Sequence, residues 1–476
     1  MHPQAIDDEA VYSVVANEIL DGGRPYVDAL ERKPPLLFWT YAGVFKGAGK
    51  YNWKALHLVA LFWTLGTMGG LYLIGWKLFN YETGLIAAFL YGIFQPGMSW
   101  KNSAFNGELL MNLPLVWAWA IAFRRDPSRT RPELFAAGAL LCAAFLLKQP
   151  AAIAGIPLGM YLLLPSYRAD RGLRRSDSAL HAGMLGAGFF GSLAIVMFVL
   201  WKQRILYDAF FWTIAAHTVP QVFWTNAVLR TLAFVGACLP LVIGAVMAQR
   251  DREGVWTGIE AERIALFALL VASAIGVAAG GRFYSHYYIQ LIPPLALLAA
   301  PHYAQLLSPK TQPRHWLRRP AVMFSWLALA ALVFSISHWL GLAPERASSE
   351  AGEFLLEHSR PEDRIFVWGH QPKIYLDSRR RPASRYILTF PLTGYIFGGS
   401  PMLGVDTRDR IMPGAWATLE QDFREHPPTY IVEVQSGSYR NYPAQDFPVL
   451  AQLLAERYLP VARTSEGVIH RLRDGQ

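Results

Sequence analysis

Apolar residues dominate the chain from about residue 55 to residue 341, where they form long runs separated by short polar segments. Runs of roughly 16 to 22 apolar residues approach the length that an α-helix needs to cross the core of a bilayer. The pattern therefore predicts an α-helical polytopic membrane domain over residues 55–341. About ten spans are expected, at Ala55–Phe79, Thr83–Met98, Leu109–Phe123, Leu134–Leu147, Ala151–Leu164, Leu180–Trp201, Leu229–Ala248, Ile264–Gly280, Tyr287–Tyr303 and Ala321–Leu340.

Residues 1–54 precede the first predicted span and have a more polar pattern. A short helix is predicted over residues 6–20, because acidic residues suited to an N-cap are followed by an apolar stripe at helical spacing. That stripe consists of Val11, Val14, Val15 and Ile19. We expect the helix to lie flat at the membrane interface. Lys33-Pro34-Pro35 then predicts a rigid corner, followed by a second interfacial segment over Leu36–Val44.

Residues 343–476 have the composition of an ordinary globular domain. Helical and strand patterns alternate there, which predicts a small α/β soluble domain. The expected helices are Glu353–His358, Ala415–Glu425 and Val449–Arg457, and the expected strands are Arg364–Trp368, Tyr430–Val434, Leu459–Arg463 and Val468–Arg471.

The net charge of +9 reflects membrane topology rather than a nucleic-acid partner. Loops on one side of the predicted spans carry sixteen Lys and Arg residues, and loops on the other side carry six. Basic residues collect in cytoplasmic loops, so the less basic side is predicted to face outward. The opening segment and the C-terminal domain fall on that outer side.

The start of the chain raises a separate expectation. Met1–Glu9 has neither a basic start nor an apolar run, so it does not resemble a secretory signal. With ten spans, a polar opening segment on the outer face needs a preceding helix to carry it there. We therefore expect about 20 further apolar residues upstream.

Three carboxylates stand out on the predicted outer face: Asp8 and Glu9 near the chain start, and Glu108 at the start of a span. Acidic residues at helix starts also serve as caps or compensate the helix dipole. Charged residues next to a membrane are functional candidates. Carboxylates presented by two separate outer loops also suit a general base or a divalent metal. The sequence does not decide between a base and a metal, and it requires no other cofactor.

Cationic residues form the second group of candidates. Lys33 precedes the two prolines, and Arg282 and His286 flank an aromatic segment. Such side chains commonly extend toward the membrane interface, and we predict that Lys148 does so. Lys33, Arg282 and His286 together would suit a phosphate at the outer membrane surface.

The order of these motifs resembles the GT-C glycosyltransferases. The motifs are Asp8-Glu9 with Tyr12, Lys33-Pro34-Pro35-Leu36, Glu108 at a helix start, and His286-Tyr287-Tyr288-Ile289-Gln290-Leu291-Ile292-Pro293-Pro294. They are most similar to the branch that contains dolichyl-phosphate-mannose protein mannosyltransferase-like and aminoarabinose transferase-like enzymes. The resemblance covers residues 5–305, and Asp363–Gly369 with Pro372–Leu376 is similar to the soluble domain of bacterial members.

The resemblance implies roles for individual residues. Asp8 corresponds to the catalytic base with Glu9 beside it, and Glu108 to a second acidic position. Lys33 corresponds to the lysine that faces the donor phosphate. His286 and Tyr287 match the last outer motif, with Arg282 assisting.

The implied activity is transfer of a sugar from a polyprenyl-phosphate donor to a lipid, glycan or protein acceptor, by one inverting displacement. The resemblance implies that this takes place at the outer, periplasmic face of a bacterial inner membrane. Family members normally begin with a membrane helix ahead of the acidic loop, and this sequence has none before Asp8. A transporter or flippase for lipid-linked sugars is the alternative, although transporters commonly place their polar residues at mid-membrane within inverted repeats. A binding or sensing module would leave the acidic and Lys-Pro-Pro motifs unexplained.

Overall fold

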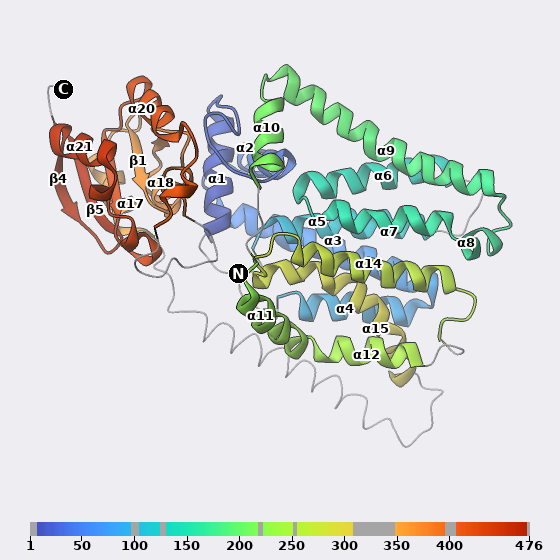
Figure 1. The fold of residues 1–476 in the computed structure, drawn as a ribbon. Helices are drawn as coiled ribbons and strands as arrows, with labels where there is room; N and C mark the ends of the chain where they lie inside the picture. The colour runs from blue at the N-terminus through green and yellow to red at the C-terminus, as the bar shows by residue number, and fades with distance from the viewer. Residues whose placement is uncertain are drawn as a thin grey trace. The chain divides into compact units, whose positions relative to one another are not determined.

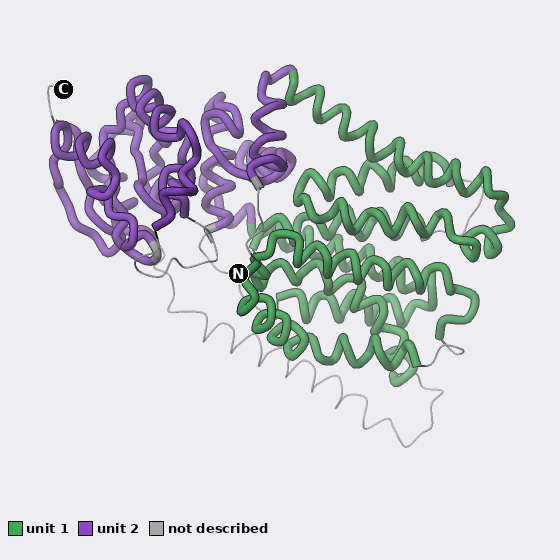
Figure 2. Tube along the Cα trace, viewed as in Figure 1, with its two compact units in different colours: residues 1, 57–201, 217–343 green, residues 2–56, 202–216, 344–476 purple. Residues whose placement is uncertain are grey.

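The computed structural model describes residues 7–96, 104–123, 130–217, 222–250, 255–307, 348–395 and 406–473. The chain divides into two compact units (Figure 2). The first, called here the helical unit, consists of residues 57–201 and 217–343 together with residue 1. The second, called the mixed unit, joins residues 2–56, 202–216 and 344–476. The opening segment thus belongs to the same compact unit as the C-terminal region.

The helical unit is built almost entirely of apolar helices (Figure 1). They are α3 (Trp53–Leu78, whose first turn belongs to the mixed unit), α4 (Tyr81–Phe94), α5 (Gly107–Ala122), α6 (Thr130–Leu147), α7 (Ala151–Leu163), α8 (Pro165–Ala169), α9 (Arg175–Lys202), α11 (Trp224–Ala237), α12 (Leu239–Arg250), α14 (Glu260–Ala278), the 3-10 helix η4 (Ser285–Leu291) and α15 (Ile292–Leu307). Helix α5 packs against α6, α7 against α14, and α15 against α4 and α12.

Several of these helices suit a membrane. By length and composition, α3, α9 and α14 can each cross a bilayer, and α11 with α12 adds a fourth if the bent pair is one span. Helices α4, α5 and α7 are apolar but shorter. A membrane protein with several apolar helices is therefore confirmed, whereas the number of about ten spans stays a prediction. The predicted span Ala321–Leu340 lies outside the described residues.

Two predicted spans are interrupted at prolines. The span expected over Leu229–Ala248 is two helices, α11 and α12, bent by 73° around Cys238. Pro240 in the first turn of α12 lacks the N–H that a continuous helix would use. The span expected over Tyr287–Tyr303 likewise begins as the 3-10 helix η4 and becomes α-helical at Ile292, where Pro293 and Pro294 occupy the first turn of α15.

Glycine allows two of the long helices to approach closely. A Cβ atom at Gly138 of α6 would lie 2.0 Å from the carbonyl oxygen of Leu185 in α9. A Cβ atom at Gly188 of α9 would lie 1.9 Å from the carbonyl oxygen of Phe135 in α6. Small residues at a helix crossing bring the two backbones into contact, which is how helices associate where lipid removes the hydrophobic driving force.

A buried ion pair joins α7, the segment after α8, and α14. Arg171 donates to Glu262 at 3.1 Å and to the hydroxyl of Tyr161 at 2.8 Å, and that hydroxyl donates to Glu262 at 2.9 Å. The guanidinium also lies 4.3 Å from the ring centre of Tyr167. A charge in an apolar interior is tolerated only when it is paired, and here every charged group has its partner.

The mixed unit contains a five-stranded sheet in the order β2-β1-β3-β5-β4. The strands are β1 (Arg364–Trp368), β2 (Arg381–Pro382), β3 (Tyr430–Val434), β4 (Tyr458–Arg463) and β5 (Gly467–Leu472). Strand β1 runs parallel to β2 and β3, and β5 runs antiparallel to β3 and β4. All four strands predicted from the sequence are present, with β1 and β3 at the predicted residues.

Helices complete the mixed unit. They are α1 (Asp7–Leu20), α2 (Pro35–Ala48), α10 (Leu206–Thr213), α17 (Glu350–His358), α18 (Lys373–Ser378), α19 (Phe390–Thr393), α20 (Ala415–Glu425) and α21 (Pro448–Arg457). The helices expected near 353–358, 415–425 and 449–457 are confirmed as α17, α20 and α21. The short elements α18 and β2 were not predicted.

Helix α1 differs in its environment from the expected flat, one-sided helix. Residues 9–18 are all buried, including the polar Ser13, Asn17 and Glu18. Helix α1 packs against α2 and against α18 of the C-terminal region. The expectation of a single buried stripe was wrong because the partner that covers the polar side comes from residues more than 350 positions later in the sequence.

The polar side of α1 is held by one bidentate ion pair. The guanidinium of Arg381 donates to both carboxylate oxygens of Glu18, at 3.0 and 2.7 Å. The Glu18 side chain is only 4% exposed, so its charge depends on this partner. Planar bidentate pairing of this kind is stronger than a single contact and fixes the relative orientation of the two groups.

We predict that Arg381→Ala loosens α1. The substitution leaves a nearly buried carboxylate without its two donors, which costs about 1–3 kcal/mol. Amide hydrogen exchange in α1 should therefore become about tenfold to a hundredfold faster. The matched control is Arg408→Ala, which removes an arginine from the exposed pair with Asp406. Equal exchange in α1 for both variants would contradict the structural role of Arg381.

Candidate functional site

The residues singled out in the sequence divide between the two units. Glu108, Arg282, His286 and Tyr287 belong to the helical unit, and Asp8, Glu9 and Lys33 belong to the mixed unit. Each group is described within its own unit.

Glu108 stands in the first turn of α5. Asn106 caps this helix by accepting a hydrogen bond from the backbone N–H of Leu109 at 2.9 Å. The helix dipole favours an anion at this end, which suits a carboxylate in the first turn. Glu108 is nevertheless only 2% exposed, so the dipole and cap alone do not account for a charged group there.

The cation that accompanies Glu108 is Lys148, which sequence reasoning had assigned to the membrane interface. Its Nζ lies 2.8 Å from Oε1 of Glu108, and the side chain is 8% exposed. The same ammonium lies 5.1 Å from the ring centre of Tyr287. Gly107 makes room for the lysine, since a Cβ there would lie 3.0 Å from Cδ of Lys148. Lys148 therefore points inward to an anion and an aromatic face.

His286 and Tyr287 reach this cluster from η4, which packs against α5. The Nε2 atom of His286 lies 3.9 Å from Oε1 of Glu108, the same oxygen that faces Lys148. The imidazole stacks on Tyr284 with ring centres 5.6 Å apart and meets Tyr287 edge-on at 4.9 Å. These aromatic contacts hold the ring of His286 in one orientation. The structure thus brings together three of the four predicted residues of this unit.

Arg282 has a different setting. Its guanidinium lies 5.1 Å from the ring centre of Phe223, a cation–π contact. The backbone N–H of Phe223 donates to the carbonyl of Gly281 at 3.0 Å, which holds the two segments together. Phe283 follows with φ of 52°, an uncommon conformation for a bulky residue.

In the mixed unit, Asp8 and Glu9 open α1 beside α2. Glu9 is 1% exposed, whereas Asp8 is half-buried. Tyr12 meets Tyr41 edge-on, with ring centres 5.7 Å apart, which fastens the first turns of α1 to α2. Burial, together with the charges of Glu9 and Asp8, raises the pKa of Tyr41 well above its usual value. Two carboxylates are thus gathered near one phenol.

Lys33 stands immediately before α2. Pro34 and Pro35 fix the entry to that helix, and the hydroxyl of Tyr26 donates to the carbonyl of Lys33 at 2.8 Å. The Nζ atom of Lys33 lies 3.6 Å from Oε1 of Glu31. Arg32, next to it, lies over the ring of Phe390. Pro34 has φ of −65° and Pro35 begins α2, so the predicted turn is present, and about a fifth of the Lys33 side chain is exposed there.

Metal binding finds no donor set among the residues that the structure describes. No three His, Cys, Asp or Glu side chains of that part of the chain are grouped to hold a metal ion. The carboxylate of Glu108 faces an ammonium at 2.8 Å, and a cation so placed repels a second positive charge. We assign no step to a metal.

This chain is similar to one family of known proteins and to several solved structures. Residues 32–201 match the family described as Dolichyl-phosphate-mannose-protein mannosyltransferase. No curated protein matches the chain significantly.

Solved structures match over nearly all of the chain. ArnT from Cupriavidus metallidurans bound to undecaprenyl phosphate has a TM-score of 0.65 at 14% identity, covering 98% of this chain and 94% of ArnT. The apo state of ArnT matches with a TM-score of 0.61 at 13% identity, over 97% and 93% of the two chains.

A third similar structure is the archaeal oligosaccharyltransferase AglB from Archaeoglobus fulgidus. It matches with a TM-score of 0.55 at 13% identity, over 98% of this chain and 70% of AglB. The chain therefore has the fold of these structures, and the family match over residues 32–201 supports the predicted resemblance to the GT-C glycosyltransferases.

Proposed function

We propose that this protein is a membrane glycosyltransferase that moves a sugar from a polyprenyl-phosphate carrier to a lipid, glycan or protein acceptor. The observation that carries the proposal is the match of the whole fold to ArnT bound to undecaprenyl phosphate. The family match over residues 32–201, which begins next to Lys33, supports it.

The proposed reaction is one direct displacement. An acceptor hydroxyl or amine attacks the anomeric carbon, its proton passes to a carboxylate, and the bond from that carbon to the phosphate oxygen breaks. The polyprenyl phosphate leaves with the bonding electrons, and the configuration at the sugar carbon inverts. Because phosphate is already a good leaving group, the enzyme needs a base and cations but no general acid.

Asp8 is our candidate for the base. It is half-buried, whereas its neighbour Glu9 is almost fully buried, so Asp8 is the more accessible of the two to an acceptor. Helix α1 is held at its other end by the pair between Glu18 and Arg381, which supports a fixed position for Asp8. A general base must be held within hydrogen-bond reach of the proton that it takes.

Lys33, Arg282 and His286 are our candidates for the donor phosphate, with Tyr287 next to His286. The rigid corner at Lys33 supports this role, since a fixed cation stabilises developing charge without reorganising. Glu108 is proposed to act through its neighbours. Its carboxylate, paired with Lys148 and facing His286, supports a role in positioning the η4 segment rather than in taking a proton.

We also propose the orientation that the charged loops indicate. Residues 1–54 and 343–476 are assigned to the outer face, and residues 55–341 to the membrane. The bias of Lys and Arg toward the opposite loops supports this orientation.

We predict that Asp8→Asn abolishes transfer. Loss of a general base lowers kcat by roughly 10²- to 10⁴-fold. The assay is transfer of labelled sugar from a polyprenyl-phosphate donor by the protein in lipid nanodiscs. Asp7→Asn is the control, because Asp7 has no counterpart in the resemblance, and it should retain activity. Full activity of Asp8→Asn would refute the assignment.

We predict that Lys33→Gln lowers kcat by about 100-fold, because a fixed cation is lost from the leaving phosphate. Lys33→Arg should restore part of the activity, as it returns the charge with altered geometry. Lys46→Gln provides the control, since Lys46 is exposed on α2 close by in the sequence. The role fails if Lys33→Gln and Lys46→Gln transfer sugar at the same rate.

We predict that Lys148→Met lowers the unfolding temperature more than the double variant Glu108→Gln/Lys148→Met. Removing one partner of a buried pair leaves an uncompensated charge and costs about 3–5 kcal/mol, whereas removing both charges avoids that cost. Thermal unfolding in one detergent measures the difference. If the double variant is less stable than Lys148→Met, the charge on Glu108 is not what the lysine compensates.

A further inference from the structure

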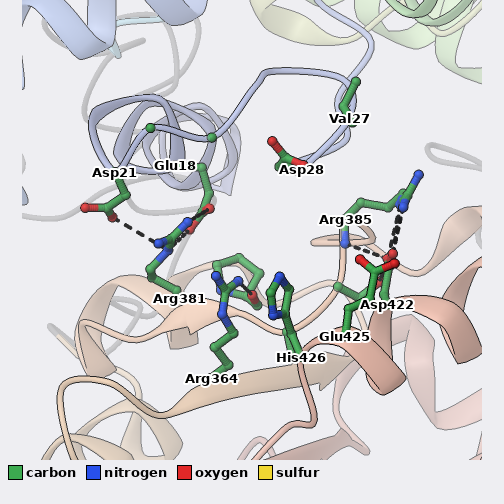
Figure 3. Close-up of a pocket in the computed structure, with 15 residues that line it drawn as sticks. Glu18, Asp21, Val27, Asp28, Arg364, Arg381, Arg385, Asp422, Glu425 and His426 are labelled. Atoms are coloured by element: carbon green, nitrogen blue, oxygen red, sulfur yellow. Dashed lines mark hydrogen bonds and ion pairs between the residues drawn. The ribbon is translucent and has the colours of Figure 1, made fainter.

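The mixed unit contains a polar pocket that the proposed transfer reaction does not use (Figure 3). Its volume is about 260 Å³. One side comes from the end of α1 and the following loop, with Glu18, Asp21 and Asp28. The other comes from the C-terminal region, including Arg364, Arg381, Arg385, Asp422, Glu425 and His426 (Figure 3).

Four of the five carboxylates in this pocket are already neutralised. Glu18 pairs with Arg381, Asp21 with Lys50, Asp28 with Arg24, and Asp422 with Arg385. The last of these pairs is bidentate, with Arg385 reaching both oxygens of Asp422 at 2.7 to 3.1 Å. The negative charges of these four carboxylates are therefore compensated by ion pairs.

Two opposite charges remain. Within the described part of the chain, Arg364 has no acidic partner, and its side chain donates to the carbonyl of Pro382 at 2.7 Å. Burial and the neighbouring guanidinium of Arg381 lower the pKa of Arg364, and the carboxylates of Glu18, Asp28 and Asp21 offset this shift only in part. Among the described residues, Glu425 accepts a side-chain hydrogen bond from Gln421 alone, at 2.9 Å. The pocket therefore offers one donor group and one acceptor group beyond its own pairs.

This balance discriminates between classes of ligand. A lipid chain is disfavoured because polar side chains line most of the pocket. A phosphate would meet the carboxylate of Glu425, which has no ion-pair partner in the described part of the chain, and a polyamine would meet the guanidinium of Arg364. A neutral hydroxylated molecule avoids both penalties, because each hydroxyl donates one hydrogen bond and accepts others. Arg364 and Glu425 can then each bind a hydroxyl of the same ligand.

We infer that this pocket binds one neutral sugar unit of the acceptor. The inference rests on the proposed transferase function, to which it adds an acceptor subsite and a substrate class. Glu18 follows Asp8 by ten residues on α1, which places the pocket about 15 Å from the proposed base along the helix. The unit bound there is thus remote from the sugar that receives the transfer and sets acceptor specificity.

Direct binding to the full-length protein tests this inference. The protein is held in nanodiscs or an amine-oxide detergent, because maltoside detergents carry sugar head groups. Saturation-transfer NMR with D-mannose, D-galactose and N-acetylglucosamine is compared with inorganic phosphate and spermidine. We expect at least one neutral sugar to bind weakly, because no Trp, Tyr or Phe side chain lines the pocket for stacking. Its affinity should change little with salt, since a neutral ligand is not screened.

Two variants connect binding to the pocket. Arg364→Gln and Glu425→Gln should each weaken sugar binding about tenfold or more, as a hydrogen bond to a charged group is lost. Glu420→Gln on the same helix and Arg360→Gln are the matched controls, because both side chains lie outside the pocket, and they should bind as the unaltered protein does. Unfolding temperatures of all four variants identify any that fail to fold.

The outcomes separate this inference from the proposed function. Asp8→Asn should stop transfer yet leave sugar binding unchanged. Unchanged binding in both pocket variants, binding of phosphate or spermidine in place of sugar, or no binding at all would overturn the pocket assignment, whatever the transfer assay gives. Sugar binding without transfer by the unaltered protein would retain the pocket and refute its role as an acceptor subsite.

Discussion

Paired charge in a low-dielectric interior is the constraint on which the rest of this structure depends. An unpaired buried charge is too costly to survive folding, so each such group must meet an opposite group at hydrogen-bond distance. Glu108 meets Lys148, Glu262 meets Arg171, and Glu18 meets Arg381. Each pair joins segments far apart in the sequence, and together they fix which segments lie next to one another.

The pair between Glu18 and Arg381 links the first helix to the last part of the chain. It explains why residues 2–56 share a compact unit with residues 344–476 although the long apolar region separates them in sequence. If Asp8 is the base, then a residue of the C-terminal region helps to hold it in place. The C-terminal sheet would then support the catalytic base, and the pocket that its strands β1 and β2 help to line would bind the acceptor sugar that we propose.

Local patterns predicted most elements well, and their failures have identifiable causes. The strands β1 and β3 and the helix α20 occupy the predicted residues, because the strands are short runs of β-branched and aromatic residues and the helix has an amphipathic pattern. The break between α11 and α12 was missed because Pro240, which lacks the N–H that a continuous helix would use, lies within an apolar run. The prediction for Lys148 was wrong because a lysine at the end of an apolar run has the same sequence pattern in two situations. Its side chain can extend to the membrane interface or pair with a buried carboxylate, as it does here with Glu108.

The sequence by itself determined the apolar helices, the small C-terminal α/β region and the family motifs, because periodicity, composition and short motifs are local properties. It also identified Glu108, His286 and Tyr287 as candidates. Only the tertiary structure decided that Lys148 completes their cluster, that α1 is buried on its polar side, and that Arg364 and Glu425 line one pocket. Those facts depend on contacts between residues tens to hundreds of positions apart, and no local pattern specifies which distant charge will neutralise which.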